Sequence, residues 1–245
     1  MENPNNIVIE MHKVAKYFGD NKVLKDINLQ LIKGENLAVI GKSGTGKSVL
    51  IKCLVRLMEP DEGNIMVLGK DICAMKSNEL NEIRKKMGFL FQSAALYDSM
   101  TVRENLEFPL RELPRKERHN LNERVEEALQ NVGLLDTIDQ MPAELSGGMR
   151  KRLGLARSLI LNPEIMLYDE PTTGLDPITS KEISQLILEV QKKYNTSSII
   201  ITHDMECVRI TSNRIAVINE GKCTAQGSYQ ELEKSEDKGV RPFFE

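Results

Sequence analysis

The sequence predicts an α/β fold: a mostly parallel sheet covered by helices on both faces, preceded by antiparallel strands and interrupted by a helical subdomain. Apolar runs at 37–40, 165–170 and 198–203 are separated by segments with helical spacing, which is typical of buried parallel strands. The first 32 residues contain two strand-like stretches around a polar turn. Helical spacing over residues 92 to about 161 predicts a helical subdomain inserted into a single domain of 245 residues.

The N-terminal stretches IVIEM and VLKDINLQLI lie within residues 7–32, and the turn sequence GDN separates them. Apolar stretches on both sides of such a turn predict an antiparallel hairpin. This hairpin leads into the first apolar run of the parallel sheet.

The next segment, LAVIGKSGTGKSVL at 37–50, contains the phosphate-binding pattern G-x-x-x-x-G-K-[ST]. The fixed positions of the pattern are Gly41, Gly46, Lys47 and Ser48. An apolar run before the loop predicts a strand, and VLIKCLVRLM after it predicts a helix. A flexible surface turn is the alternative interpretation, and the flanking strand and helix argue against it.

The chemistry of this loop suits a nucleotide phosphate with a magnesium ion. Glycines such as Gly44 let backbone amides point at one centre without side-chain clashes. The helix start adds its positive end, Lys47 adds a full charge, and the Ser48 hydroxyl can hold magnesium. Tyr17 and Phe18 precede the hairpin turn, and two interpretations stay open: both rings pack on the sheet, or one stacks on the nucleotide base.

The segment after the loop alternates between turns, a strand and a helix. Residues 59–72 combine two turn clusters with a short strand, and helical spacing follows at 80–83. The charged residues at 84–86 are expected to be a solvated helix end. GFLFQ at 88–92 predicts a buried strand that ends on the amide of Gln92.

Helical spacing dominates the following region. The periodic apolar residues are Leu121, Val125, Ala128, Leu129 and Val132. LSGGMRKR at 145–152 opens a further helix, with Arg150, Lys151 and Arg152 in its first turn. Each such cation opposes the helix dipole by about 0.3 to 1 kcal/mol. We therefore expect an anion docked at this helix start, with cations that fan out into solvent as the alternative.

Two carboxylates, Asp169 and Glu170, end the second apolar run. Adjacent carboxylates at a buried strand end need a cation, which magnesium bound with a nucleotide supplies. We predict that Asp169 is oriented to the metal and that Glu170 polarises the water attacking the γ-phosphate. A surface pair that caps a turn before Pro171 is the alternative. His203 ends the third apolar run, and ligands of open α/β sheets bind beyond such strand ends, so these groups are expected to converge.

The last elements complete the sheet. Apolar spacing over 183–190 predicts an amphipathic helix between the second and third apolar runs. RIAVI at 214–218 and KCTAQG at 222–227 predict an edge hairpin. The tail from residue 228 predicts one short helix and a polar end.

Composition excludes several classes of protein. Lys and Arg total 33 and Asp and Glu total 36, a formal net charge of −3, so no nucleic-acid partner is expected. The 4 cysteines are far apart and predict buried or incidental thiols, not disulfides or a zinc site. No signal peptide or membrane-spanning run is expected, so work at a membrane would require partner proteins reached from the cytoplasm.

In this order and spacing, the motifs resemble those of ATP-binding cassette (ABC) ATPases over essentially the whole chain. The resemblance is carried by the Walker A loop GKSGTGKS, the signature motif LSGGM, the Walker B strand IMLYDE and the switch-histidine strand SIIITHD. It implies a P-loop NTPase core, ATP and Mg²⁺ as cofactors, and ATP hydrolysis coupled to transport. It implies catalysis by Glu170, His203 and Gln92, and metal binding by Ser48, Gln92 and Asp169.

The resemblance also implies nucleotide binding by a larger set of residues. These are Phe18, Gly41, Ser43, Gly44, Thr45, Gly46, Lys47, Ser48, Val49, Ser146, Gly147, Gly148 and Asp176. In this family two ATPase domains pair head to tail, so the LSGG helix start of one copy would cap the γ-phosphate held by Lys47 of the other. The implied assembly is a homodimer bound to integral-membrane permease subunits, on the inner face of the bacterial cytoplasmic membrane.

One departure from the family pattern is Met149, where the usual signature has glutamine. The same methionine is familiar in ATPases of Mla and Mce phospholipid transporters, and the segments at 91–112, 145–159 and 169–180 are similar to that branch. This narrower resemblance implies phospholipid movement between membranes and an MCE-domain lipid-binding partner. In such ATPases the segment after Gln92 contacts the permease, with an ordinary packed loop as the alternative.

Other functions stay open as alternatives. An ATPase of an amino-acid or other solute importer comes first, because it shares every core motif. A soluble ATP-switched clamp acting on DNA or ribosomes usually has coiled-coil arms or two cassettes, and the sequence contains neither. A small-molecule P-loop kinase would not need the LSGG helix start.

Overall fold

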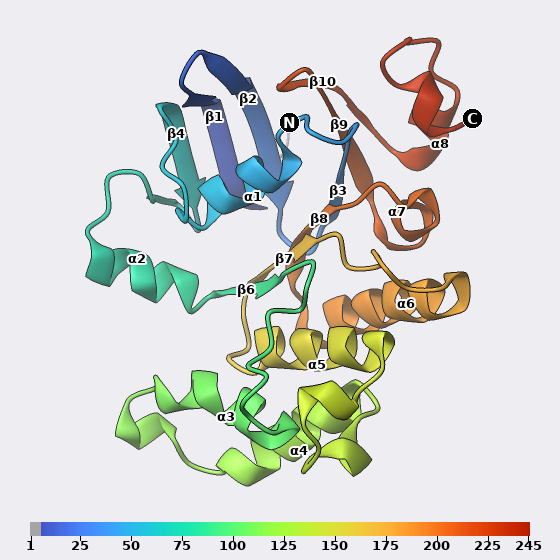
Figure 1. The fold of residues 1–245 in the computed structure, drawn as a ribbon. Coiled ribbons are helices and arrows are strands. Elements are labelled where there is room, and N and C mark those ends of the chain that lie inside the picture. The colour runs from blue at the N-terminus through green and yellow to red at the C-terminus, as the bar shows by residue number, and fades with distance from the viewer. Residues whose placement is uncertain (1–5) are drawn as a thin grey trace.

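The computed structural model describes residues 6–245, which contain two sheets with helices between them and below them (Figure 1). The antiparallel sheet has the spatial order β2-β1-β4-β5. Its strands are β1 (Ile7–Phe18), β2 (Asn21–Ile32), β4 (Glu62–Val67) and β5 (Lys70–Asp71). β1 and β2 pair antiparallel across the predicted turn, so the N-terminal hairpin is confirmed.

The second sheet has the order β10-β9-β3-β8-β7-β6. Its strands are β3 (Asn36–Ile40), β6 (Met87–Leu90), β7 (Ile165–Asp169), β8 (Ser197–Ile201), β9 (Arg214–Asn219) and β10 (Lys222–Gly227). All neighbours run parallel except β9 and β10, which form the predicted edge hairpin. Every residue of β3, β7 and β8 is buried, which is why these strands appear in the sequence as continuous apolar runs.

Eight α-helices are described in residues 6–245. They are α1 (Lys47–Leu54), α2 (Ser77–Arg84), α3 (Val102–Arg111), α4 (Leu121–Asn131), α5 (Gly147–Leu159), α6 (Pro177–Tyr194), α7 (Met205–Thr211) and α8 (Tyr229–Glu233). Short 3₁₀ helices are η2 (Arg115–Glu117), η3 (Leu135–Thr137), η4 (Pro142–Glu144) and η5 (Arg241–Phe243). None of the helices described is long and apolar enough to cross a membrane.

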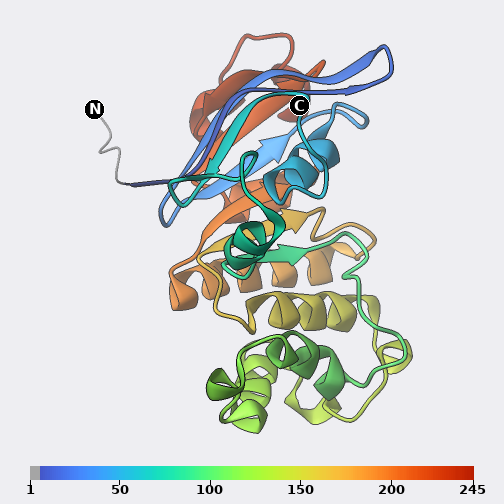
Figure 2. The ribbon, with the colours of Figure 1, turned by 90° about the vertical axis from the view of Figure 1, so that its left-hand side faces the viewer.

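The elements form layers that Figure 2 shows from the side. α1 and α2 lie between the two sheets, α5 and α6 cover the opposite face of the parallel sheet, and α3 and α4 form the far end of the molecule. Successive side chains of β3 point to opposite faces of the sheet, so this one strand contributes to two hydrophobic cores. Leu37 and Val39 pack in the core that contains α1, whereas Ala38 and Ile40 pack in the one that contains α7. Each buried large aliphatic side chain stabilises the fold by about 1.5–3 kcal/mol.

Two local predictions need correction, and one helix was missed. α1 ends at Leu54 and does not continue through Met58, because Arg56 adopts a left-handed φ of 51°. β6 ends at Leu90, so Gln92 follows the strand and is not part of it. α7 was not predicted, because its 7 residues are too few to show a helical period.

Candidate phosphate-binding and catalytic site

A cavity of about 370 Å³ lies beyond the carboxyl ends of β3, β7 and β8, which are neighbours in the sheet. Its lining consists of Val23, Ser43, Gly44, Gly46, Lys47, Ser48, Val49, Gln92, Glu170, Thr173 and His203. The strand ends that were expected to converge therefore do so. The order of the sheet is responsible, since it places three strands from different parts of the sequence next to one another.

The phosphate-binding loop needs its glycines for two different reasons. Gly44 and Gly46 have φ values of 80° and 98°, in a region that side chains disfavour. Gly46 is also closely packed, since a Cβ atom there would lie 2.8 Å from Leu24 Cδ2 and 3.0 Å from the backbone oxygen of Val23. A Cβ atom on Gly41 would clash with the backbone oxygen of Ile218. Thus β2 and β9 pack so closely on the loop that it has no room to move to accommodate a side chain at Gly46 or Gly41.

Lys47 brings a buried positive charge to the loop. Its side chain is only 8% exposed, and Nζ donates hydrogen bonds to the carbonyl oxygens of Gly41 at 2.6 Å and Lys42 at 3.1 Å. Burial lowers the pKa of Lys47, and the carboxylates of Glu170 and Asp169 oppose that shift. Because both acceptors are neutral carbonyls, the ammonium group remains available to attract an anion in the cavity.

The neighbouring acidic group fits a hard metal ion. Asp169 is 8% exposed, and Ser48 Oγ donates to its Oδ1 at 3.4 Å. Burial first, and then the nearby charge of Glu170, raise the pKa of Asp169. No group of three or more His, Cys, Asp and Glu side chains suited to a metal occurs within residues 6–245. A hydroxyl beside one carboxylate is a ligand pair that suits Mg²⁺, which usually takes its remaining ligands from phosphate and water.

Glu170 has an unusual backbone that directs its carboxylate. Its φ is 52°, and its amide donates to Ile201 O at 2.8 Å. Its Oε2 accepts a hydrogen bond from Thr173 Oγ1 at 3.1 Å and lies 2.8 Å from His203 Nδ1. Both contacts use one carboxylate oxygen, so Oε1 is not engaged by either of them. This arrangement suits a general base whose orientation is set by two neighbours.

Other predicted nucleotide-binding residues lie outside the described lining of this cavity. Ser146 caps α5, where its Oγ accepts a hydrogen bond from Met149 N at 3.2 Å, and Gly147 and Gly148 follow in the first turn. Asp176 caps α6 with hydrogen bonds from the amides of residues 178 and 179, both at 3.0 Å. Phe18, at the end of β1, is 48% exposed.

Two further predicted residues, Thr45 and Gly41, make contacts that hold the loop in shape and do not line the cavity. Thr45 Oγ1 donates to Lys42 O at 2.8 Å, and Gly41 makes the close approach to β9. The two aromatic residues before the hairpin turn, Tyr17 and Phe18, lie in different environments. The Tyr17 hydroxyl donates to Glu62 at 2.8 Å, whereas the ring of Phe18 stays exposed. The alternative in which both rings pack on the sheet is therefore wrong.

The three cations predicted in the first turn of α5 lie in different environments. Lys151 is buried and donates to the carbonyl oxygens of Gln92 and Glu170. Arg152 forms an ion pair with Glu182 at 2.8 Å. Only Arg150 of the three cations is exposed. Protein groups therefore engage two of these charges within the chain, so the alternative in which all three cations fan out into solvent is wrong. The anion at the start of α5 stays a prediction.

Sequence reasoning missed Val23 and Thr173 in the lining and misread Lys151. Thr173 had a weak local signal, because a hydroxyl three residues after Glu170 can reach back to its carboxylate within a turn. Val23 and Lys151 had none. Their positions depend on segments that are distant in the sequence.

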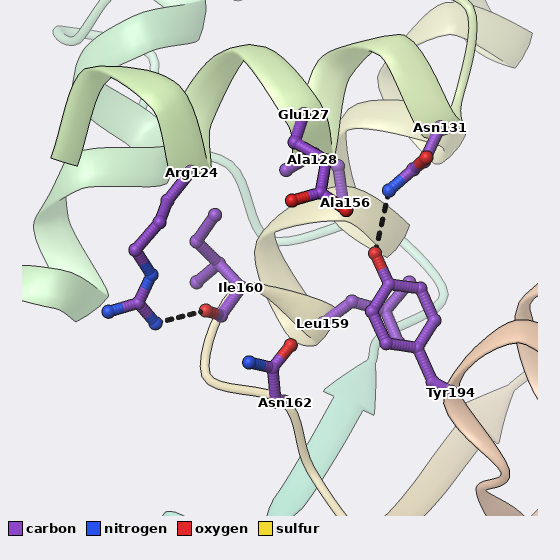
Figure 3. A pocket seen from close by; sticks show the side chains of 9 residues that line it. All are labelled: Arg124, Glu127, Ala128, Asn131, Ala156, Leu159, Ile160, Asn162 and Tyr194. Atoms are coloured by element: carbon purple, nitrogen blue, oxygen red, sulfur yellow. Dashed lines mark hydrogen bonds between the residues drawn. The ribbon is translucent and has the colours of Figure 1, made fainter. Parts of the chain in front are cut away.

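A second cavity, of about 60 Å³, lies between α4, α5 and the end of α6 (Figure 3). Asn131 Nδ2 donates to the Tyr194 hydroxyl at 2.7 Å, and Arg124 donates to Ile160 O at 2.9 Å. No predicted site residue is among its described lining. At about 60 Å³ this space is much smaller than the roughly 300–1,000 Å³ of typical ligand pockets.

The cysteines agree with the expectation of thiols without a disulfide. Cys53, Cys73, Cys207 and Cys223 are all free. Burial raises the pKa of Cys53 and of Cys207 to about 11, so these thiols stay protonated and unreactive at neutral pH.

Comparison with known proteins identifies the family. Residues 24–173 match the description of the ABC transporter family. The chain is 39% identical to the "Probable ribonucleotide transport ATP-binding protein mkl" of Mycobacterium leprae, over 98% of this chain and 70% of that protein. It is 37% identical to the "Intermembrane phospholipid transport system ATP-binding protein MlaF" of Haemophilus influenzae, over 98% of this chain and 91% of that protein.

A solved structure gives the same result. The structure titled "Dimeric Structure of MJ0796, a Bacterial ABC Transporter Cassette" superposes with a TM-score of 0.80 at 31% identity, covering 90% of this chain and 98% of the other. The fold agrees with this match, and the phosphate-binding loop and the paired carboxylates at the end of β7 lie within the residues that match the family. The chain therefore belongs to the ABC transporter family, as an ATP-hydrolysing cassette.

Proposed function

We propose that this chain is the motor subunit of a membrane transporter that moves phospholipids between membranes. The motor assignment depends on one observation, which is that Lys47, Ser48 and Glu170 line the same cavity. The start of α5, with Gly147 and Gly148, is not part of that lining, so a second copy is the partner that it would serve. ATP hydrolysis in that cavity would then depend on contact with a second copy.

The chemistry follows from the site. Lys47 and the loop amides bind the phosphates, with Phe18 stacking on adenine at the rim. Ser48, Asp169 and Gln92 are the residues that would hold Mg²⁺, which supplies charge neutralisation at the phosphates.

Glu170 accepts the proton of the attacking water, and His203 is placed to steady the carboxylate through Oε2. Because general-base assistance is worth about 10² to 10⁴ in rate, Glu170→Gln should lower ATP turnover by that factor and leave ATP affinity nearly unchanged. Phosphate release and nucleotide titration measure the two quantities. Glu189→Gln changes an exposed glutamate on α6 and serves as the control. Wild-type turnover in Glu170→Gln would remove this residue from the mechanism.

A homodimer completes the site. Ser146, Gly147 and Gly148 form a helix N-terminus with a positive dipole end, which suits the γ-phosphate bound by another copy. The similarity to a dimeric cassette supports this arrangement. The dimer would act on integral-membrane permease subunits from the inner face of the bacterial inner membrane. The dimer would bind Mg²⁺-ATP, and we expect it to bind no nucleic acid.

Two relatives of nearly equal identity differ in the substrate for which they are named. The mkl relative is named for ribonucleotide transport and MlaF for phospholipid transport, at nearly equal identity. Met149 in the signature motif and the stretches similar to the Mla and Mce branch favour phospholipid, with an MCE-domain protein as a further partner. A solute importer is the second candidate, because a ribonucleotide, for which the mkl relative is named, is a solute and not a lipid.

The substrate test uses the native complex. The tagged chain is purified from its own membranes, its partners are identified by mass spectrometry, and bound lipids are extracted. Reconstituted vesicles then report ATP-dependent transfer of labelled phospholipid. Bound phospholipid with ATP-dependent transfer is the expected result. ATP-driven uptake of a nucleotide or amino acid, without lipid transfer, would contradict the lipid assignment and favour the importer.

A further inference from the structure

Lys151 is a buried lysine that the chemistry of the cavity does not yet use. Its side chain is 6% exposed, and lysine is almost never buried to this extent without partners. Its position on α5 places it one turn after the capping residue Ser146. The buried ammonium group of Lys151 is therefore expected to have hydrogen-bond acceptors within the protein.

Its partners are two carbonyl oxygens from the edge of the catalytic cavity. Nζ donates to Gln92 O at 2.5 Å and to Glu170 O at 3.1 Å. These acceptors follow β6 and β7, which are neighbours in the sheet. One side chain from α5 thus joins two strand ends that both contribute to the cavity lining.

The same face of α5 packs closely on the segment after β6. At the next turn a Cβ atom on Gly154 would lie 2.9 Å from Leu90 Cδ1 and from Ala94 Cβ. One turn further, Arg157 donates to Ala94 O at 3.1 Å. The spacing of Lys151, Gly154 and Arg157 by three residues keeps these contacts on one side of the helix. The start of α5 and the segment after β6 are therefore held as one body.

Glu170 needs such support. Its left-handed φ of 52° is disfavoured for a residue with a side chain, by about 1 to 3 kcal/mol, and persists only where the surroundings impose it. Its amide donates to Ile201 O, and its carbonyl accepts hydrogen bonds from Lys151 Nζ at 3.1 Å and from Thr173 N at 3.3 Å. Since the backbone at Glu170 directs the carboxylate, loss of the Lys151 contact would leave the carbonyl with the longer of its two hydrogen bonds and let the carboxylate move.

We propose that Lys151 is a positioning residue for ATP hydrolysis, which fixes Glu170 through its main-chain carbonyl and links it to the helix that engages the second copy. This inference rests on the proposed role of Glu170 as the general base. Contact of α5 with a partner's nucleotide is thereby transmitted to the carboxylate of the same copy.

The test compares Lys151→Met with the wild type and with Lys151→Arg. Displacement of a catalytic group by about 1 Å costs on the order of 10² in rate, so Lys151→Met should lower kcat by about 10- to 100-fold. The KM for ATP should change by less than about threefold, because the phosphate-binding loop is untouched. Lys151→Arg keeps the charge and the donors, and should recover most of kcat. Lys192→Met removes an exposed charge on α6 and should behave as the wild type.

A second readout separates positioning from assembly. In a Glu170→Gln background the carboxylate is already absent, so Lys151→Met should leave the ATP-dependent dimer intact in size-exclusion chromatography. Loss of that dimer would overturn the inference, because Lys151 would then act in assembly. If Lys151→Met does not fold, Lys151→Gln is measured instead and should show the same loss of kcat, because its side chain is uncharged and too short to replace the lysine contacts to both carbonyls.

The outcome also distinguishes this inference from the proposed function. Normal kcat in Lys151→Met, together with an inactive Glu170→Gln, would overturn the role of Lys151 alone. Normal turnover in Glu170→Gln would overturn the catalytic assignment itself.

Discussion

At the scale of single residues, the site is built from groups that are unfavourable for folding. Asp169 is almost completely buried next to Glu170, and Lys47 is buried beside them. Burial raises the pKa of Asp169 and lowers that of Lys47, so burial destabilises the charged form of each group. Mg²⁺ and a triphosphate would relieve both costs.

This cost predicts a stabilising substitution. Because the folded-state pKa of Asp169 is raised, its protonated form favours folding below the unfolded pKa of about 3.9, and this stability is lost as pH rises through the folded pKa. At pH 7 without nucleotide, Asp169→Asn should therefore raise Tm, by about 2–4 °C for each kcal/mol recovered. The gain should disappear near pH 4 and below.

Calorimetry with and without Mg²⁺-ATP checks this prediction. The variant should gain less stability than the wild type from Mg²⁺-ATP, because it lacks the metal-binding carboxylate. Asp136→Asn, at an exposed position in η3, should leave Tm nearly unchanged. A lower Tm for empty Asp169→Asn at pH 7 would contradict the argument from burial.

At the scale of elements, the junction of β3 and α1 is the most constrained part of the chain. Lys47 is the first residue of α1, and Gly46 is its N-cap in the left-handed conformation. The hairpin strand β2 packs directly on that glycine. The antiparallel sheet is therefore part of the phosphate site, since it fixes the shape of the loop.

Two glycine substitutions separate backbone conformation from packing. Gly44→Ala meets only the conformational cost, on the order of 1–2 kcal/mol, because nothing lies within 4 Å of its added Cβ. Gly46→Ala meets a similar cost and also contacts Leu24 and Val23. Gly46→Ala should thus lower Tm and ATP affinity more than Gly44→Ala. Equal losses in thermal melts and nucleotide titrations would show that β2 does not constrain the loop.

At the scale of the whole molecule, the two regions predicted to bind phosphate lie in separate places in each copy. The cavity with Lys47 and Glu170 lies at the strand ends, and the α5 start with Ser146 lies outside its described lining. Two-fold pairing of identical chains would join one half from each copy, twice.

A mixing experiment tests this pairing. Glu170→Gln removes the base and Ser146→Arg blocks the helix start, so each variant alone should hydrolyse ATP very slowly. A mixed dimer would contain one site with both intact halves. An equal mixture should recover roughly a quarter of wild-type activity if pairing is random and the two sites act independently. Activity equal to the sum of the separate variants, with mixed dimers verified, would mean that each site is complete within one copy.

The sequence by itself determined the parts of this protein that are local. The buried runs of β3, β7 and β8, the phosphate-binding loop and the start of α5 were all predicted, because strand burial, glycine spacing and helical periodicity are properties of neighbouring residues. The roles of Phe18, Ser146, Gly147, Gly148 and Asp176 stay predictions, since they concern ligands or a second copy.

Only the tertiary structure decided how distant groups meet. Lys151 looked like a surface cation of a helix start, yet it reaches Gln92, 59 residues away, and the carbonyl of Glu170. The left-handed backbone of Glu170 and the wall that Val23 forms were also invisible in the local pattern. The physical reason is that a buried charge takes whatever acceptors the packing of layers brings to it, and the order of strands in a sheet is set by long-range contacts.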